Sequence, residues 1–302
     1  MRNLRFEFSA DKRLNPIAAL FWFLLNFLRN LKSSSVDRAL IVKKQESIDK
    51  GIVAAVSKDR SPARRVSDIF WMSIPVEEIV SVLGKVRVLE VGCGKGGYGR
   101  FMRDVFQEGF ERYTGIDIVK SDEWDSFDKA SYSFQVASAN DFKDFISDSN
   151  LIITQSALEH FPDDDLYFQQ IRNFVSASSY PILQIHLVPS SPCLRLYLLH
   201  GYRQYTINSI SRITKKFSKE TYRILYSLGG RNVNSIHYKY WTKRYFSKTN
   251  SSIELDKFNT EFVEALNQDL KSKSDFNEAS FFCLVLFHNC PDDFIQRFTS
   301  VV

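Results

Sequence analysis

The sequence predicts an α/β fold in which helices cover both faces of a mostly parallel sheet. From residue 86 onward, short apolar runs alternate with stretches of helical periodicity, which is typical of parallel strands joined by crossover helices. One apolar run breaks into a glycine-rich turn that opens a helix, as in folds that bind nucleotide-like ligands. The 302 residues are 44% apolar, so the chain can bury a full core.

Residues 1–65 form a basic extension that carries one apolar helix. Asn15 and Pro16 are a typical N-cap and first helical position, and the stretch 17–28 begins with a run of nine apolar residues. A membrane-spanning helix needs about 20 apolar residues, so this stretch is too short to cross a bilayer. It either lies in a membrane interface, with Trp22 and the neighbouring Phe side chains inserted, or packs against its own domain or a partner subunit.

The predicted core follows at residues 66–188. Ser33-Ser34-Ser35 marks a linker before it, and residues 67–83 are expected to form a helix that Pro75 interrupts. The strands expected next are 86–91, 112–118, 132–137, 150–155 and 181–188, and the helices are 97–107 and 163–178, with a short crossover near 122–130.

Residues 189–250 are predicted to be a basic helical lid, and residues 251–302 the C-terminal part of the sheet. Pro189 ends the regular alternation, and residues 206–228 have apolar side chains at helical spacing, with Gly229-Gly230 as a helix stop. The elements expected beyond the stop are a helical segment 240–246, a strand 252–255, a helix 259–272 and a strand 280–288.

The glycine-rich turn follows a strand that carries an acid near its end. Glycines permit both a tight turn and the close approach of a ligand to the backbone, and the carboxyl edge of a parallel sheet is where ligands bind. Asp117 lies about 20 residues further on, so the spacing also fits a dinucleotide site. The Glu90 carboxylate would repel a pyrophosphate and attract an ammonium or sulfonium group, which favours a cationic ligand. The glycines are Gly92, Gly94, Gly96, Gly97 and Gly99.

The pattern Glu90-x-Gly92-x-Gly94-x-Gly96 resembles motif I of the class I S-adenosylmethionine-dependent methyltransferases. The resemblance continues at Asp117, which ends the second strand. The stretch 149–165, SNLIITQSALEHFPDDD, looks like the fourth strand and LEH turn of ubiquinone-type O-methyltransferases. The resemblance covers roughly residues 85–190. It implies a Rossmann-like seven-stranded sheet whose last strand is antiparallel, and S-adenosyl-L-methionine as cofactor.

The resemblance also implies the cofactor contacts. Glu90 would hold the methionine ammonium, the backbone around Cys93 would contact the cofactor, and Asp117 would take the ribose hydroxyls. The loop 138–140 would contact adenine, although it lacks the Asp that the family often has there. The other cofactor positions are Gly92, Gly94, Gly96, Ile118, Ala139, Asn140, Gln155 and Ser156.

Methyl transfer is a direct displacement in which the protein aligns the acceptor and, for an alcohol or phenol, removes a proton. His160 in the LEH turn and His186 at the end of the fifth strand are candidate bases, because histidine titrates near neutral pH. Either histidine could instead be structural. The residues at the head of the lid either bind the acceptor, with Arg203 pairing a carboxylate or phosphate, or pack the lid on the core. They are His200, Tyr202, Arg203 and Tyr205.

The net charge of +5 hides a strong asymmetry. Residues 189–250 carry 12 Lys and Arg against one acid, residues 1–65 carry 14 against 6, and the rest of the chain is left at −14. Such separation indicates an anionic partner, which could be a membrane surface, an acidic substrate or nucleic acid. The alternative is that basic helices neutralise the acidic core.

The cysteines do not form a metal-binding pattern, and no metal is expected. Cys93, Cys193, Cys283 and Cys290 lack zinc-type spacing, and Cys283 and His288 should point to opposite faces of one strand. Scattered cysteines suit a reducing compartment.

We expect O-methylation of a small-molecule, glycan or lipid-linked acceptor by a cytoplasmic enzyme, peripheral to the inner face of the membrane if the apolar helix binds lipid. If that helix packs on a second subunit, the protein is a homo-oligomer. A signal peptide would fit the N-terminus, but secretion would separate the protein from cytosolic S-adenosylmethionine. A nucleic-acid methyltransferase is the alternative that the basic lid suggests, although QSALEH stands where amino-methylating DNA enzymes carry a Pro-Pro-aromatic motif. A non-catalytic adaptor of the same fold is the third possibility, against which the intact glycines and Glu90 argue.

Overall fold

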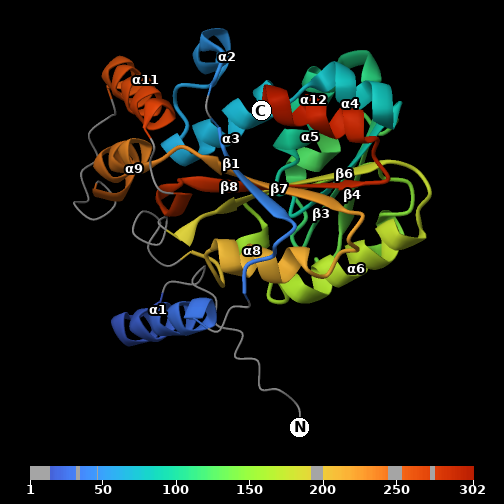
Figure 1. Ribbon diagram of the computed structural model, residues 1–302, viewed down its shortest axis with the longest axis horizontal. Coiled ribbons are helices and arrows are strands. Elements are labelled where there is room, and N and C mark those ends of the chain that lie inside the picture. The colour runs from blue at the N-terminus through green and yellow to red at the C-terminus, as the bar shows by residue number, and fades with distance from the viewer. Residues whose placement is uncertain (1–13, 32–34, 46, 192–199, 244–253, 273–275) are drawn as a thin grey trace.

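The centre of the molecule is an eight-stranded sheet (Figure 1). A computed structural model describes residues 14–31, 35–45, 47–191, 200–243, 254–272 and 276–302. The strands are β1 (Leu40–Lys44), β2 (Val86–Val91), β3 (Phe110–Asp117), β4 (Tyr132–Val136), β5 (Leu151–Gln155), β6 (Ile182–Pro189), β7 (Tyr222–Leu228) and β8 (Phe281–His288). Their order is β1-β7-β8-β6-β5-β2-β3-β4. All neighbours pair in parallel except β8, which is antiparallel to both β6 and β7.

Helices cover both faces of this sheet, as Figure 1 shows. One face carries α3 (Pro62–Ser73), α4 (Val76–Leu83), α5 (Gly97–Phe106) and α12 (Asp292–Val301), with α9 (Arg231–His237) and α11 (Leu255–Lys271) beside α3. The other face carries α6 (Asp164–Ala177) and α8 (Ile207–Thr214). The shorter helical elements are α2 (Lys50–Ala55), η1 (Gln107–Gly109), η2 (Asp122–Ser126), η3 (Lys143–Phe145), η4 (Leu158–His160), η6 (Tyr238–Thr242) and η7 (Phe276–Glu278).

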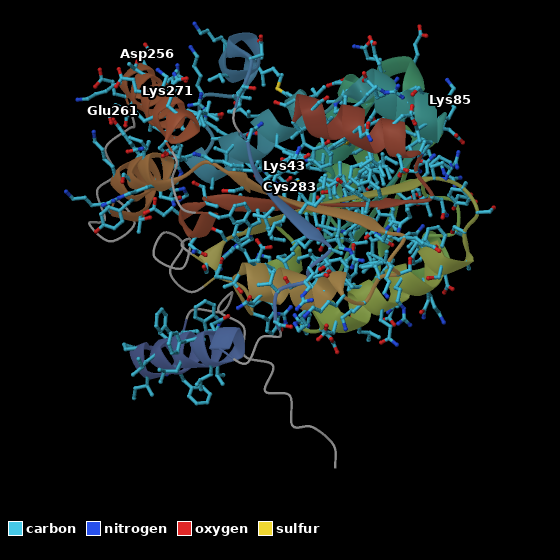
Figure 2. The ribbon with its side chains drawn as sticks, viewed as in Figure 1. Lys43, Lys85, Asp256, Glu261, Lys271 and Cys283 are labelled. Atoms are coloured by element: carbon cyan, nitrogen blue, oxygen red, sulfur yellow. The ribbon has the colours of Figure 1, made fainter. Side chains whose placement is uncertain are left out.

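The middle strands are buried on both faces, as expected of a sheet covered by two helical layers. Figure 2 shows Cys283 in this core. Cys283 packs among the residues under α3 and α12, whereas His288 of the same strand contacts Phe217 on the α8 side. The prediction that Cys283 and His288 point to opposite faces is confirmed.

Most of the predicted core is confirmed. The five predicted strands correspond to β2 through β6, the two long helices to α5 and α6, and the helix before them divides into α3 and α4 at Pro75. Strands β2 to β8 form the seven-stranded sheet that the sequence resemblance implied, with β8 as its antiparallel strand. The fold is therefore the Rossmann-like α/β fold that the sequence predicted, with β1 as an additional edge strand.

The prediction of one long helix over residues 206–228 is wrong. Thr206 caps α8, which ends at Thr214, and residues 222–228 are strand β7. Ile224 and Leu228 have helical spacing, but β7 is paired on both edges, by β1 and β8, and this pairing favours the extended form. Residues 189–250 are thus not one lid, because β7 belongs to the sheet.

Two smaller expectations also need correction. The predicted extension contributes the sheet strand β1 and the helix α2, and α11 begins at Leu255, where a strand was predicted. Residues 32–34 and 244–253, which carry part of the predicted linker, helical segment and strand, lie outside the described residues.

The apolar helix of the extension, α1 (Pro16–Leu31), lies apart from the sheet (Figure 1). It is joined to the core through Trp22, which is 1% exposed and whose Nε1 donates to the Gly201 carbonyl at 2.9 Å. No helix in the described part of the chain is long and apolar enough to cross a membrane. The exposed apolar side chains of α1 are Ile17, Leu20, Phe21, Phe23, Leu24, Phe27 and Leu28.

Candidate functional site

The glycine-rich loop turns sharply after β2 and is held by backbone bonds to β3. The amides of Gly92 and Cys93 both donate to the Ile116 carbonyl, at 2.7 and 3.0 Å. Gly92 has φ +82°, and a Cβ there would lie 2.4 Å from that of Ala157, so only glycine fits. A Cβ at Gly94 would meet no atom within 4 Å, because Gly94 borders a cavity.

This cavity, of about 430 Å³, lies at the carboxyl ends of β2 and β5, the edge at which α/β folds bind ligands. Side chains of both charges face it. Asp68 pairs with Arg60 at 2.9 Å and accepts a hydrogen bond from the Tyr98 hydroxyl at 2.7 Å, and the Arg64 guanidinium lies 4.7 Å from the Tyr98 ring centre. The lining residues are Arg60, Arg64, Asp68, Glu90, Gly92, Cys93, Gly94, Lys95, Gly97, Tyr98, Phe101, Gln155 and Ser156.

The sequence reasoning missed the contribution of α3. Residues up to 65 were expected in an extension outside the core, yet Arg60 and Arg64 reach the cavity, together with Asp68. Arg64 and Asp68 lie four residues apart in the helix that starts at Ser61-Pro62, so they are on one side of it, and Arg60 lies directly before that start. That spacing is the signal that could have identified them.

Glu90 is the buried acid of the cavity. It is 2% exposed, and the Tyr113 hydroxyl donates a hydrogen bond to its Oε2. Burial raises the pKa of Glu90 to about 7, although the Tyr113 hydrogen bond and the Arg64 charge act in the opposite direction. The negative charge of Glu90 is unfavourable in this buried position, and a cationic ligand beside the carboxylate would stabilise it.

The ends of β3 and β4 border the other side of the loop. Asp117 accepts hydrogen bonds from the amides of Gly94 at 2.8 Å and Val119 at 3.1 Å, so its carboxylate fixes the loop as well as facing it. Ile118 beside it is 71% exposed, an apolar surface next to the acid. Ala139 is buried, and the Asn140 carbonyl accepts a hydrogen bond from Gln170 of α6.

Three further predicted cofactor residues line the cavity. The Gln155 Oε1 accepts a hydrogen bond from the Trp71 indole at 3.0 Å. Ser156 has φ +50°, a left-handed conformation that is rare outside glycine and concentrates at functional sites. Burial raises the pKa of the Cys93 thiol, so Cys93 stays protonated and offers its backbone rather than a nucleophile.

The LEH turn brings a second group of side chains together. His160 Nε2 lies 3.1 Å from His200 Nε2, and the Glu159 Oε1 lies 3.9 and 3.8 Å from these two nitrogens. The turn follows Ser156 directly and packs through Ala157 against Gly92, so it adjoins the glycine loop. Tyr202 joins the group through its amide, which donates to the Glu159 carbonyl at 2.7 Å.

Other predicted catalytic and acceptor residues are turned into the core. His186 is fully buried, and its ring nitrogens contact Thr154 at 3.0 Å and Gln184 at 3.1 Å. Burial lowers the pKa of His186 to about 3. This environment argues against His186 as a base.

Arg203 and Tyr205 hold the segment before α8 to the turn before α6. Arg203 donates to the Phe161 and Pro162 carbonyls, both at 2.8 Å. The buried Tyr205 hydroxyl donates to Asp164 at 3.2 Å. These contacts fit the packing alternative for the two residues, and of the predicted acceptor group only His200 and Tyr202 remain beside His160.

Much of the basic charge in residues 189–250 is paired. Arg212 and Lys216 pair with Asp165 of α6, the latter at 2.9 Å. Arg223 is buried in β7 and pairs with Asp37 at 3.0 Å. These pairs fit the alternative in which basic elements neutralise an acidic core, and they weaken the argument for nucleic acid.

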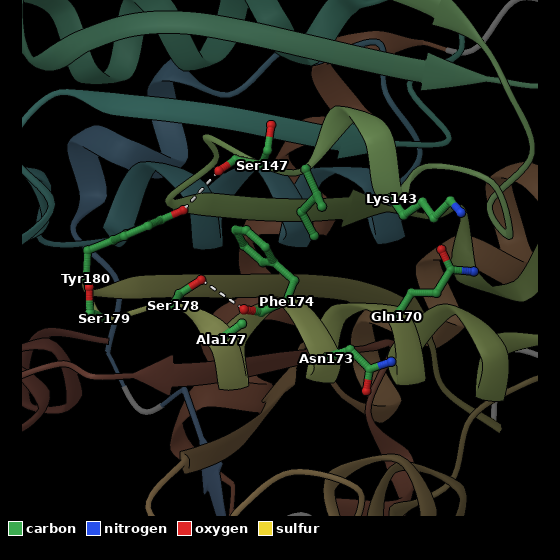
Figure 3. A pocket seen from close by; sticks show the side chains of 10 residues that line it. Lys143, Ser147, Gln170, Asn173, Phe174, Ala177, Ser178, Ser179 and Tyr180 are labelled. Carbon is green, nitrogen blue, oxygen red and sulfur yellow. Dashed lines mark hydrogen bonds between the residues drawn. The ribbon is translucent and has the colours of Figure 1, made fainter.

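A second cavity, of about 570 Å³, lies between η3 and α6 (Figure 3). Figure 3 shows Tyr180 and Ser147 at one side of it, where the Tyr180 hydroxyl donates to the Ser147 carbonyl at 3.4 Å. Both residues shortly precede a strand, so the cavity lies toward the amino ends of β5 and β6, opposite the ligand-binding edge. Of the described residues that line it, only Lys143 is charged. We therefore place the functional site at the smaller cavity.

Solved structures similar to this chain include methyltransferases. The 1,6-didemethyltoxoflavin-N1-methyltransferase of Burkholderia thailandensis, with S-adenosylhomocysteine bound, is 12% identical, with 91% of each chain covered and a TM-score of 0.42. A plantazolicin methyltransferase is 13% identical over 80% of this chain and 90% of its own, with a TM-score of 0.45. The phosphoethanolamine N-methyltransferase 2 of Haemonchus contortus is 14% identical over 70% of this chain and 52% of its own, with a TM-score of 0.40. The sequence matches no protein-family model and no curated protein.

Proposed function

We propose that this chain is an S-adenosylmethionine-dependent methyltransferase. The observation that carries the proposal is the cavity in which a buried acid, Glu90, faces the glycine loop while two arginines enter from the start of α3 and the residue just before its N-cap. The amino-acid end of S-adenosylmethionine carries an ammonium and a carboxylate. Glu90 and Asp68 offer partners for the ammonium, and Arg60 and Arg64 offer partners for the carboxylate. A dinucleotide would bring its pyrophosphate beside two carboxylates, which is unfavourable.

The remaining cofactor contacts follow from the loop geometry. Gly94 leaves open space on the cavity side, and Asp117 stands beside it, in reach of ribose hydroxyls. The exposed Ile118 offers an apolar surface to the adenine, and Asn140, in the loop that follows β4, offers a partner for its polar edge. When bound, S-adenosylmethionine supplies the methyl group and the sulfonium leaving group.

We infer that the acceptor lies on the side of the LEH turn. His160 and His200 are half-buried and adjoin the glycine loop through the turn that contacts Gly92. An imidazole in this position is suited to take the proton from a hydroxyl acceptor while the cavity aligns the methyl group. This supports O-methylation, with a small molecule, a glycan or a lipid-linked compound as the acceptor.

A transfer assay tests the proposal. The full chain is incubated with S-adenosylmethionine carrying a labelled methyl group and with separate lipid, glycan and RNA fractions, alongside the Glu90→Gln variant. We expect label in the lipid or glycan fraction, and a strong loss of label with the variant. Label in RNA alone would favour the nucleic-acid alternative. Cofactor binding without any labelled fraction would favour the adaptor.

The exposed face of α1 supports a peripheral membrane location. Trp22 and Asn26 face inward, whereas the opposite side presents large apolar side chains to solvent. Residues 1–65 carry a net charge of +8, which complements anionic lipid. We propose that α1 lies in the surface of an anionic membrane, where a lipid-linked acceptor would be at hand.

Vesicle co-sedimentation tests the role of α1. The full chain should pellet with anionic vesicles at low salt, and a chain that begins at residue 33 should stay in the supernatant. A Phe23→Ser/Phe27→Ser variant should also lose binding, while the matched variant Val301→Ser, which removes an exposed apolar side chain elsewhere, should not. If the full chain stays in the supernatant, α1 packs on protein instead, and the homo-oligomer becomes the better account.

A further inference from the structure

We propose that Glu159, His160 and His200 form a binding site for one divalent transition-metal ion. The two imidazoles and the carboxylate come from two segments 40 residues apart, and their ligand atoms all lie within 4.8 Å of one another. In the plane of the two Nε2 atoms and the Glu159 Oε1, one point is equally far from all three atoms, at about 2.1 Å. This distance falls within the roughly 2.0–2.2 Å of zinc bonds to nitrogen and oxygen. The three atoms therefore have the spacing of a metal-ligand set.

The His200 segment is held against the LEH turn by contacts that do not involve the imidazoles. The Tyr202 amide donates to the Glu159 carbonyl at 2.7 Å, and the Trp22 indole donates to the Gly201 carbonyl at 2.9 Å. Gly201 has φ +66°, and a Cβ there would lie 2.4 Å from the Glu159 carbonyl oxygen. Only glycine lets the two segments approach this closely, so the backbone presents both histidines before any ion binds.

The donor set and its burial define the class of ion. Two imidazoles with one carboxylate suit Zn²⁺, Co²⁺, Fe²⁺ or Mn²⁺ better than Ca²⁺ or Mg²⁺, which prefer oxygen ligands. The Glu159 side chain is 1% exposed, whereas those of His160 and His200 are 32% and 39% exposed. Three protein ligands that open toward solvent on one side leave a coordination position for water or for an acceptor oxygen, as in catalytic metal sites.

The role of the ion, unlike its binding, rests on the proposed function. A hydroxyl acceptor bound to the ion has a lowered pKa. It loses its proton to solvent, its oxygen forms the bond to the methyl carbon, and the carbon–sulfur bond breaks with its electron pair left on sulfur. His160 then acts as a metal ligand rather than as a general base.

Titration of the chelator-treated full chain with Co²⁺, followed by visible absorption, tests the site. We expect one Co²⁺ per chain, with the absorption of a four- or five-coordinate ion that Zn²⁺ abolishes by displacement. His200→Gln and His160→Gln should each weaken binding more than about tenfold. Glu111→Gln, which removes an exposed carboxylate at the opposite edge of the sheet, should leave it unchanged. No Co²⁺ binding by the native chain, or binding that both histidine variants retain, overturns the proposal.

A backbone variant tests the site without removing a ligand. Gly201→Ala should displace His200 and weaken Co²⁺ binding about 10- to 100-fold. Gly84→Ala has the same φ of +66° but open space around its Cβ, so it carries the conformational strain alone and should bind Co²⁺ normally. Equal affinity in the two variants contradicts the proposed geometry.

S-adenosylhomocysteine binding to the metal-free chain separates this proposal from the proposed function. If the chain binds S-adenosylhomocysteine but not Co²⁺, only the proposed metal site is refuted. If the native chain does not bind S-adenosylhomocysteine, the methyltransferase assignment is wrong instead.

Discussion

Replacing Glu90 with Gln should stabilise the ligand-free protein at high pH and weaken its cofactor binding. The buried carboxylate has a pKa of about 7 in the folded protein against a usual value of 4.5. As the pH rises from 4.5 to 7, the unfolded chain releases this proton before the folded protein does, so the folded protein loses stability over this range. The Glu90→Gln variant has a neutral amide at this position, so its stability does not fall for this reason as the pH rises.

The magnitude follows from the shift in pKa. One pKa unit corresponds to about 1.4 kcal/mol, so ionised Glu90 costs the folded protein up to about 3 kcal/mol above pH 7. The difference in unfolding free energy between Glu90→Gln and the native protein should therefore grow by this amount between pH 4.5 and pH 8. Chemical denaturation at these two pH values measures the difference. A pH-independent difference would refute the burial argument.

S-adenosylhomocysteine should reverse the effect at Glu90. An ammonium beside the carboxylate forms a charge-assisted hydrogen bond worth about 1.5–3 kcal/mol, or roughly 10- to 150-fold in affinity. The native protein should thus bind this ligand more tightly at pH 8 than at pH 6, and Glu90→Gln should show little change between the two. Calorimetry at both pH values checks this, and equal pH dependence in the two proteins would place the ammonium elsewhere.

Three further predictions concern the glycine loop and the core. Asp117→Ala should weaken S-adenosylhomocysteine binding by about 1.5–3 kcal/mol and loosen the glycine loop, since Asp117 also accepts the Gly94 amide; unchanged affinity by calorimetry would contradict its position. Gly92→Ala should lower the unfolding free energy more than Gly94→Ala, because both lose a left-handed glycine, at about 1–2 kcal/mol, and only Gly92 adds a clash with Ala157; thermal melts that rank them the other way would refute this. The native protein should lose stability as the pH falls below 6.5, because the pKa of His186 is lowered to about 3 and the unfolded chain takes up a proton that the folded one does not. His186→Gln should reduce that loss by up to about 3 kcal/mol between pH 6.5 and pH 4, and an unchanged slope in denaturation experiments would argue that His186 is not buried and neutral.

Local patterns in the sequence predicted the alternating strands and helices of the core. Strands β2, β5 and β6 are short apolar runs, β3 and β4 mix apolar with polar residues, and α6 begins directly after the capping residue Asp163. The strand 222–228 could not be predicted in this way, because its apolar spacing is compatible with a helix as well as with a strand. Its pairing with β1 and β8, elements 180 and about 60 residues away, decides between them.

In the candidate site, too, residues of a local motif could be predicted from the sequence, and residues brought together by long-range contacts could not. Glu90, Gly92 and Asp117 are neighbours in a motif, so their roles could be predicted from spacing. The contribution of Arg64 depends on α3 folding over the loop, and the pairing of His160 with His200 depends on Gly201 packing against Glu159. The spacing of Arg64 and Asp68 places them on one side of α3. Both contacts are nevertheless long-range, and no local pattern predicts what that side of α3, or His160, packs against.

Isothermal titration of the full chain with S-adenosylhomocysteine and with NAD, at pH 8 where Glu90 is ionised, tests the central claim most directly. We predict one S-adenosylhomocysteine per chain with micromolar-range affinity, and no heat from NAD, whose pyrophosphate would lie beside Glu90 and Asp68. Tight binding of NAD with none of S-adenosylhomocysteine would contradict the interpretation of the glycine loop and the activity built on it.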